Sequence, residues 1–329
     1  MSRSLKRIWA IALLTCMEGL RQPAFFLMVA VSAAMTAFSP SFSFFHLGEQ
    51  AKMVTDLGLS TILTFSTLLA LLTASSTVTD EIEGRTALTM LSKPLRREEF
   101  LLGKYLGVAV TACALIVLMS VVLLTALRSQ KYETFQDPYF SRGVVTALLI
   151  GFLLFDIFLV ARLIFGRGIP LVGAFWIAYV AASAFLLIFL GVNSPEKTVW
   201  EWRLLGGLAC LCLHACVISA VAVALATRMT LVQAAIGTAA FFIVGHASSG
   251  ILSLFRNEQH ELSAIGVILR LILPDLDQFN NADALATAFL DQPVSIPLDV
   301  IASSGAYALL YSIFLMAIAA ALFSRRELS

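Results

Sequence analysis

Cysteine and histidine side chains gather in one apolar segment of the chain. Cys210, Cys212, His214 and Cys216 fall within seven consecutive residues, and soft ligands at that density fit Cu(I) or Zn²⁺. On a helix, Cys212 and Cys216 share one face, whereas Cys210 and His214 share another that points about 200° away. One ion cannot reach both pairs. Small residues that pack between helices explain the segment better, so we predict no metal site.

An isolated carboxylate, Asp156, lies near the middle of an apolar stretch over residues 144–165. An ionisable group at that depth of a membrane costs roughly 3 kcal/mol, so it usually faces a partner or a cavity. Asp156 is therefore a residue of the substrate path or of coupling, or else one member of a structural ion pair with Arg162 or His246. The sequence leaves both interpretations open.

Motifs of intramembrane enzymes do not occur in the sequence. His260 and Glu261 begin a zinc-protease pattern, but the second histidine is missing. A serine protease needs its serine and histidine within hydrogen-bond reach. His246, Ser248 and Ser249 share one helical segment and cannot face each other in that way. We therefore expect no catalytic residues, and a transport subunit rather than an enzyme.

The composition of the chain is that of a membrane protein. Of the 329 residues, 59% are hydrophobic and 13% are charged, which is about half the charged fraction of a soluble domain. So few charges cannot coat a globule of this size, and lipid must be the solvent for much of the chain. The five cysteines all lie in apolar segments, which does not fit a disulfide framework. The net charge of +1 indicates no nucleic-acid partner.

Eight apolar stretches are candidates to cross a hydrocarbon core about 30 Å thick. They cover residues 23–38, 57–78, 105–127, 144–165, 169–192, 204–227, 231–254 and 298–323. We predict an all-α, polytopic transmembrane bundle of about eight spans, or of six if the pair 144–165 and 169–192 does not cross. With both termini inside, fourteen of the 22 Lys and Arg residues fall in inside segments, as the positive-inside rule favours.

Residues 1–22 form an amphipathic segment ahead of the first span. Apolar side chains recur there at helical spacing, and Arg3, Lys6, Arg7 and Glu18 lie off that stripe. This pattern predicts an interfacial helix on the membrane lipid, although the same residues could be the first turns of a spanning helix. Farther along, Gly103 and Gly107 have the spacing that allows two helices to approach closely.

The outside segment 255–297 contains an apolar run, 263–273, that is too short to span a membrane. A re-entrant or interfacial helix fits its length. Acidic residues follow at Asp275, Asp277, Asp283, Asp291 and Asp299. Their spacing matches no dense calcium loop, so a solvated acidic loop is the better interpretation.

The inside segment 79–104 is too charged to enter lipid and too regularly patterned for a linker. Leu91, Leu95 and Phe100 are apolar residues in a water-facing loop, and Pro94 ends one short helix before Arg96 begins another. Apolar side chains rimmed by Arg and Glu make a docking surface for a protein. Packing of a solvated loop on its own bundle is the alternative.

This segment resembles the cytoplasmic signature of type-2 ABC permeases, the membrane subunits of many bacterial ABC exporters. The resemblance lies in Glu81-x-Glu83-Gly84-x-Thr86, Leu91-Ser92-x-Pro94-x-Arg96 and Gly103-Lys104. It implies a permease domain over residues 23–329 whose coupling helix docks on a separate ATPase. The residues implied in ATPase coupling are Glu81, Glu83, Arg85, Thr86, Leu91, Pro94, Arg96, Arg97 and Lys104.

The resemblance also implies a second cytoplasmic contact at residues 226–230 and a location in the bacterial inner membrane with both termini cytoplasmic. Family members usually have six spans, so an extra hairpin between residues 144 and 192 would explain eight. The chain has no Gly-x-x-x-x-Gly-Lys-Ser/Thr loop, since Gly103-Lys104 is followed by Tyr105. ATP and Mg²⁺ would therefore be bound by the partner ATPase, and this chain would carry no cofactor.

The predicted function is thus the permease subunit of an ATP-driven ABC exporter, acting as a homodimer or paired with a homologous permease. The alternative is a secondary transporter driven by an ion gradient. Such a carrier would be expected to hold more mid-membrane acidic residues than Asp156 alone.

Overall fold

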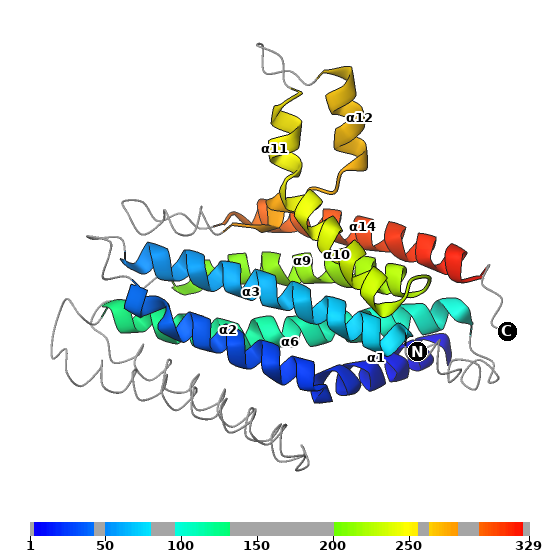
Figure 1. Cartoon of the computed structure of the whole chain (residues 1–329), viewed down its shortest axis with the longest axis horizontal. Helices are drawn as coiled ribbons and strands as arrows, with labels where there is room; N and C mark the ends of the chain where they lie inside the picture. Colours follow the sequence, from blue (N-terminus) through cyan, green and yellow to red (C-terminus); the bar gives the residue numbers. More distant parts are fainter. Residues whose placement is uncertain are drawn as a thin grey trace.

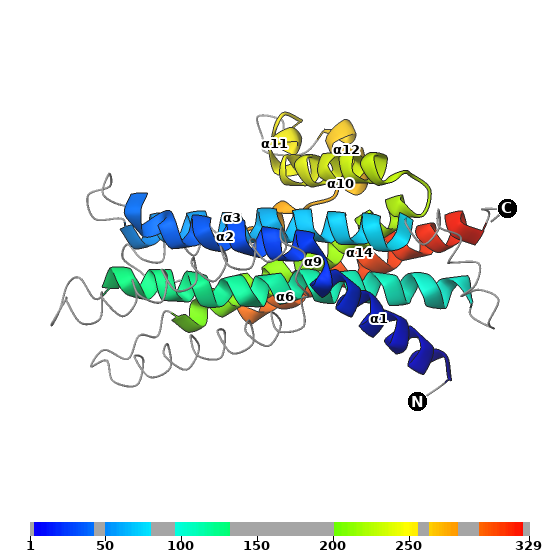
Figure 2. The same cartoon turned by 60° about the horizontal axis from the view of Figure 1, so that its bottom comes forward.

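The computed structural model describes residues 3–42, 50–79, 96–131, 201–255, 263–281 and 296–324. These ranges are helical apart from short turns and connections, and they contain no strand. The predicted all-α architecture is therefore confirmed for this part of the chain. The long helices run alongside one another in an elongated bundle (Figures 1 and 2). They are α2 (Pro23–Phe42), α3 (Gln50–Ala74), α6 (Arg97–Lys131), α9 (Glu201–Ala226) and α14 (Leu298–Ser324).

Four stretches of the described helices are long and apolar enough to cross a membrane, which supports a membrane protein. They are Lys52–Val78, Glu98–Leu124, Leu204–Ala226 and Leu298–Phe323. Two shorter apolar helices, Pro23–Thr36 and Leu231–His246, correspond to two further predicted spans. The remaining pair, 144–165 and 169–192, lies outside the described residues, so the choice between six and eight spans stays a prediction.

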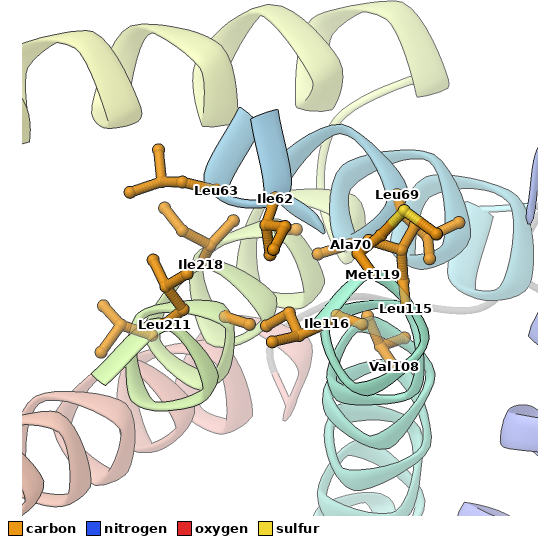
Figure 3. Close-up of a cluster of buried hydrophobic side chains, with 14 of the residues drawn as sticks. Ile62, Leu63, Leu69, Ala70, Val108, Leu115, Ile116, Met119, Leu211 and Ile218 are labelled. Carbon is orange, nitrogen blue, oxygen red and sulfur yellow. The ribbon is translucent and has the colours of Figure 1, made fainter. Parts of the chain in front are cut away.

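The bundle core is formed by close apolar packing of α3, α6 and α9. Figure 3 shows its side chains pointing toward one another from the three helices: Ile62, Leu63, Leu69, Ala70, Val108, Leu115, Ile116, Met119, Leu211 and Ile218. Hydroxyl groups among them are satisfied within their own helices, as where Thr67 donates to the Leu63 carbonyl and Ser219 to the Ala215 carbonyl. These internal bonds allow polar residues to lie in segments that lipid surrounds.

The candidate span over residues 231–254 is divided between two helices. Helix α10 (Leu231–His246) ends after 16 residues, about 24 Å of helix, and the chain turns at Ala247 into α11 (Ser248–Ser253). A carbonyl at the end of α10 bonds outside the helix. The carbonyl of Gly245 accepts the N–H of Leu276 at 3.2 Å and the hydroxyl of Ser248 at 2.8 Å. In an uninterrupted helix that carbonyl would accept the N–H of residue 249.

The apolar run predicted at 263–273 is a helix, α12 (Ala264–Ile272). The Ser263 side chain caps it by accepting the N–H of Gly266 at 3.3 Å. Together α11 and α12 form an arm that projects from the bundle beside α10 (Figure 1). Ile265 and Ile268 on α12 are more than half exposed, as suits a re-entrant or interfacial helix.

Helix α1 (Arg3–Arg21) leaves the bundle at an angle, as Figure 2 shows, and packs against the first turns of α6. It buries Ala12 and Thr15 and leaves the large apolar side chains of Trp9, Leu13 and Met17 exposed. The contact is made by glycine. A Cβ atom at Gly107 would lie 2.5 Å from the Thr15 Cβ and 2.8 Å from the Ala12 carbonyl oxygen. The predicted close approach at Gly103 and Gly107 is thus confirmed, with α1 as the neighbouring helix.

We expect Gly107→Ala to loosen α1 from α6, because the added methyl group meets backbone that cannot rotate away. Overpacking of this kind costs about 1–3 kcal/mol, which a thermal-unfolding measurement in lipid nanodiscs would detect as a lower midpoint. Gly250→Ala is the matched control, since a Cβ atom at Gly250 has no neighbour within 4 Å. Equal midpoints for the two variants would contradict the proposed contact.

Candidate functional site

One end of the bundle, which we call the base, joins α1, the start of α6, the turn at 227–230 and the end of α14 (Figure 1). It is where the coupling segment predicted from the sequence enters and leaves the bundle, because α3 ends there and α6 begins there. Residues 80–95 of that segment lie outside the described residues. The base is thus the described part of the candidate site.

Ion pairs connect α1 to α6 within the base. The Lys104 ammonium lies 3.9 Å from the Glu18 carboxylate, and Arg7 lies 3.8 Å from Glu99. Lys104 is almost fully buried, while Glu18 is about half exposed. The ammonium also lies 5.8 Å from the centre of the Phe100 ring, close enough for a cation–π interaction. A charge buried to this degree is stable only because opposite charge and a ring face surround it.

Helix α1 also contacts the other end of the coupling segment. The last turn of α3 widens into a π-helical turn, η2 (Ser75–Thr79), which directly precedes residue 80. Gln22, at the junction of α1 and α2, donates its side-chain N–H to the Ser76 hydroxyl at 2.8 Å. Turns of this type are frequent at functional sites in helices. Helix α1 therefore touches the chain on both sides of residues 80–95.

The turn at 227–230 completes the base. Arg228 donates its guanidinium N–H to the Leu322 carbonyl in the last turn of α14, where a cation also complements the helix dipole. Phe100 of α6 stacks on Phe323 of α14, with ring centroids 6.2 Å apart. The second contact segment implied by the family resemblance, residues 226–230, thus lies at the same end of the bundle as α1 and the start of α6.

The structure describes three of the nine predicted coupling residues. Arg96 is exposed directly before α6, and its carbonyl accepts the N–H of Phe100. Arg97 is the first residue of α6, and Lys104 is buried beneath α1, so its side chain is covered by the chain itself. The remaining six lie outside the described residues: Glu81, Glu83, Arg85, Thr86, Leu91 and Pro94. Asp156 lies outside them as well.

A pocket lies toward the opposite end of the bundle, between α2 and α3, with a volume of about 580 Å³. Its polar lining follows one side of α3, and Met35, Leu57 and Phe65 supply apolar surface. The lining residues are Met35, Lys52, Met53, Asp56, Leu57, Ser60, Thr61, Thr64 and Phe65. Both charges and apolar groups face this pocket, which fits a ligand with a polar and an apolar part. Sequence reasoning missed it, because the pocket depends on how α2 is rotated against α3.

The cysteine segment faces two neighbours, as helical spacing predicted. The Cys113 thiol of α6 donates to the Cys212 carbonyl at 3.9 Å and contacts Cys216, whereas His214 faces α10. Within the described ranges, no three His, Cys, Asp or Glu side chains are grouped so that they could hold a metal ion. Cys113, a neighbour from a different helix, had no signal in the local sequence pattern.

Comparison with known proteins gives no family assignment. No protein-family model matches the chain, and no curated protein matches its sequence. A proposal of function therefore depends on the residues and geometry described above.

We expect Glu18→Ala to destabilise the protein more than Lys104→Met. The first change removes a carboxylate that lies 3.9 Å from a buried ammonium, and weaker compensation of a buried charge costs about 1–3 kcal/mol. The second removes the buried charge and leaves Glu18 half exposed to solvent. Thermal unfolding in nanodiscs would measure both midpoints.

The double variant Glu18→Ala/Lys104→Met should recover most of the loss, because the pair is then removed as a unit. Glu98→Ala, an exposed carboxylate on the same helix, is the matched control and should leave the midpoint unchanged. Additive losses in the double variant would show that the two side chains do not interact.

Proposed function

We propose that this chain is the permease subunit of an ATP-driven ABC exporter, located in the bacterial inner membrane with both termini in the cytoplasm. The observation that carries the proposal is the position of α1, which contacts the chain on both sides of the predicted coupling segment. It packs against η2 before residues 80–95, where Gln22, directly after α1, bonds to Ser76. It contacts Gly103 and Gly107 after them. A force applied to residues 80–95 would therefore reach α3, α6 and α1 together.

ATP would act through the partner subunit. The ATPase binds ATP and Mg²⁺ and presses on the segment 79–104, where Arg96 is exposed for contact. Lys104 would take part without touching the ATPase, because its ion pair with Glu18 holds α1 to α6. Rigid helices packed at the base then move as a unit, as in shear and hinge motions. The permease would work with a second copy or a homologous permease, because two ATPases that close on each other need two membrane halves to move.

The pocket between α2 and α3 is the proposed place for substrate on this subunit. Its mixed lining, with Lys52 and Asp56 beside Met35 and Phe65, favours an amphiphilic molecule over a small inorganic ion. The pocket lies toward the end of the bundle away from the base. Motion of α3 at the base would therefore reach it along a single continuous helix.

The test is co-purification of the full-length chain with candidate ABC ATPases. We expect Glu81→Ala and Arg96→Ala each to weaken ATPase binding about tenfold, which is the loss expected when a contact worth about 1.4 kcal/mol is removed. The matched control is Lys131→Ala at the opposite end of α6, which should bind as the unmodified chain does.

The secondary transporter is the outcome that would overturn this proposal. Such a carrier would move substrate in proteoliposomes that contain this chain alone, without nucleotide, and it would bind no ATPase. Uptake that requires both the ATPase and ATP, and that fails in Arg96→Ala, would support the permease.

A further inference from the structure

Two histidines from different helices meet inside the bundle. His214 of α9 and His246 of α10 have ring centroids 5.3 Å apart, with their planes at 65°. His214 has no exposed surface. Phe242 and Phe279 lie beside its ring, with centroids at 5.8 Å and 6.1 Å. His214 is the eleventh residue of a 23-residue span, so the pair lies near the middle of the hydrocarbon.

The imidazole nitrogens in this pair lack partners to an extent that is unusual for buried groups. Neither Nδ1 nor Nε2 of His214 has a hydrogen-bond partner among the described residues, and the same holds for Nε2 of His246. Each unsatisfied buried group of this kind costs about 1–3 kcal/mol. Hydroxyl groups in the same bundle avoid the cost by bonding to carbonyls of their own helix, whereas of the four imidazole nitrogens only Nδ1 of His246 has such a bond, to the Phe242 carbonyl. A ligand that binds the imidazole nitrogens would offset this free-energy cost.

The second nitrogen of His246 shows which atom is free to bind. Nδ1 lies 3.1 Å from the Phe242 carbonyl oxygen. Because a carbonyl only accepts, Nδ1 must carry the proton, and the neutral ring keeps at the buried Nε2 a lone pair that no described donor satisfies. A histidine that binds a metal characteristically donates its other N–H to a backbone carbonyl in this manner. His246 is therefore already in the tautomer of a metal ligand that binds through Nε2.

The ring separation fits a shared ion. Two imidazoles that bind one ion at the usual metal–nitrogen distance of about 2 Å have centroids about 5 Å apart at a tetrahedral angle and about 6 Å apart when the two nitrogens lie on opposite sides of the ion. The observed 5.3 Å lies between these limits, so the rings would move apart by less than about 1 Å to reach a linear two-ligand geometry. Rings in simple stacking contact span the same range, so the distance permits the ion, and the unpaired nitrogens favour it.

The number of ligands and the charge select the kind of ion. The described residues offer two imidazoles and no group of three metal-binding side chains, whereas structural Zn²⁺ requires four ligands. The cost of burying an ion rises with the square of its charge, and both ligands are neutral, so a monovalent ion is strongly favoured. Cu(I) is soft, monovalent, stable with two ligands and compatible with imidazole. The rings of Phe242 and Phe279 would add cation–π stabilisation.

We propose that His214 and His246 form a binding site for Cu(I) at the centre of the bundle. The site is covered by the chain that follows α12. Leu276 packs on Gly245 and donates its N–H to that carbonyl, and this places the buried Phe279, in the short helix η3 (Asp277–Phe279), against His214. The proposal goes beyond the permease function and does not depend on it, since binding is measured without an ATPase.

The test is anaerobic titration of the purified full-length chain in nanodiscs with Cu(I), in competition with the chelator bathocuproine disulfonate. We expect one Cu(I) per chain, and at least a tenfold loss of affinity in His214→Phe and in His246→Phe. The control is the triple variant Cys113→Ser/Cys212→Ser/Cys216→Ser, which removes the neighbouring thiols and should keep the affinity. Loss of binding in the triple variant alone would overturn the proposal in favour of a thiol site.

X-ray absorption on the unmodified chain decides the ligand independently of how well the variants fold. Nitrogen ligands at about 2.0 Å would support the imidazole pair, whereas sulfur at about 2.3 Å would overturn it. A chain that binds no Cu(I) in competition with the chelator would also overturn it, and would leave the two rings as a packing or proton-binding pair.

Discussion

The close approach of α1 to α6 is the contact on which the arrangement of the base depends. Gly103 and Gly107 leave no room for a side chain, and the atoms that they meet include backbone carbonyls of α1. Such a contact holds the two helices in one register, because sliding by a turn would drive side chains into the same space. The ion pairs of Lys104 with Glu18 and of Arg7 with Glu99 then follow from that register. Each is weak alone, and the steric fit brings their atoms together.

This register has a mechanical consequence. The predicted coupling segment leaves the bundle at η2 and returns at the start of α6, and α1 touches the chain at both places. Helix α1 therefore connects η2 to the start of α6 and is not a separate element beside the bundle. Helix α14 joins the same set of contacts. Phe323 stacks on Phe100 of α6, and the Leu322 carbonyl accepts a bond from Arg228. Motion at the base would therefore be shared with α3, α6 and α14, which run toward the far end of the bundle (Figure 1).

Inside the bundle, the polar groups divide into two kinds. Hydroxyls such as Thr67 and Ser219 bond to carbonyls of their own helix, so they add little beyond helix packing. The imidazoles of His214 and His246 are different, because three of their four nitrogens have no partner in the described structure. In hydrocarbon, where water cannot compensate, a buried polar group without a partner is costly, and this cost is the reason for proposing a ligand at the two imidazoles. Helix α9 thus contacts Cys113 of α6 through its cysteine face and His246 of α10 through His214.

Apolar length and charge placement predicted an all-helical membrane protein from the sequence alone, and the described residues are helical with four stretches apolar enough to cross a membrane. The glycine spacing at 103 and 107 predicted a close helix contact. These properties are local, since they depend on residues within a few turns of one helix. Helical spacing also separated Cys212 and Cys216 from His214, but it could not supply their partners Cys113 and His246. The end of α10 at His246 likewise depended on Leu276, thirty residues later, which occupies the Gly245 carbonyl. Only the tertiary structure decided these pairings, because helix rotation and the return of a distant loop set which side chains meet.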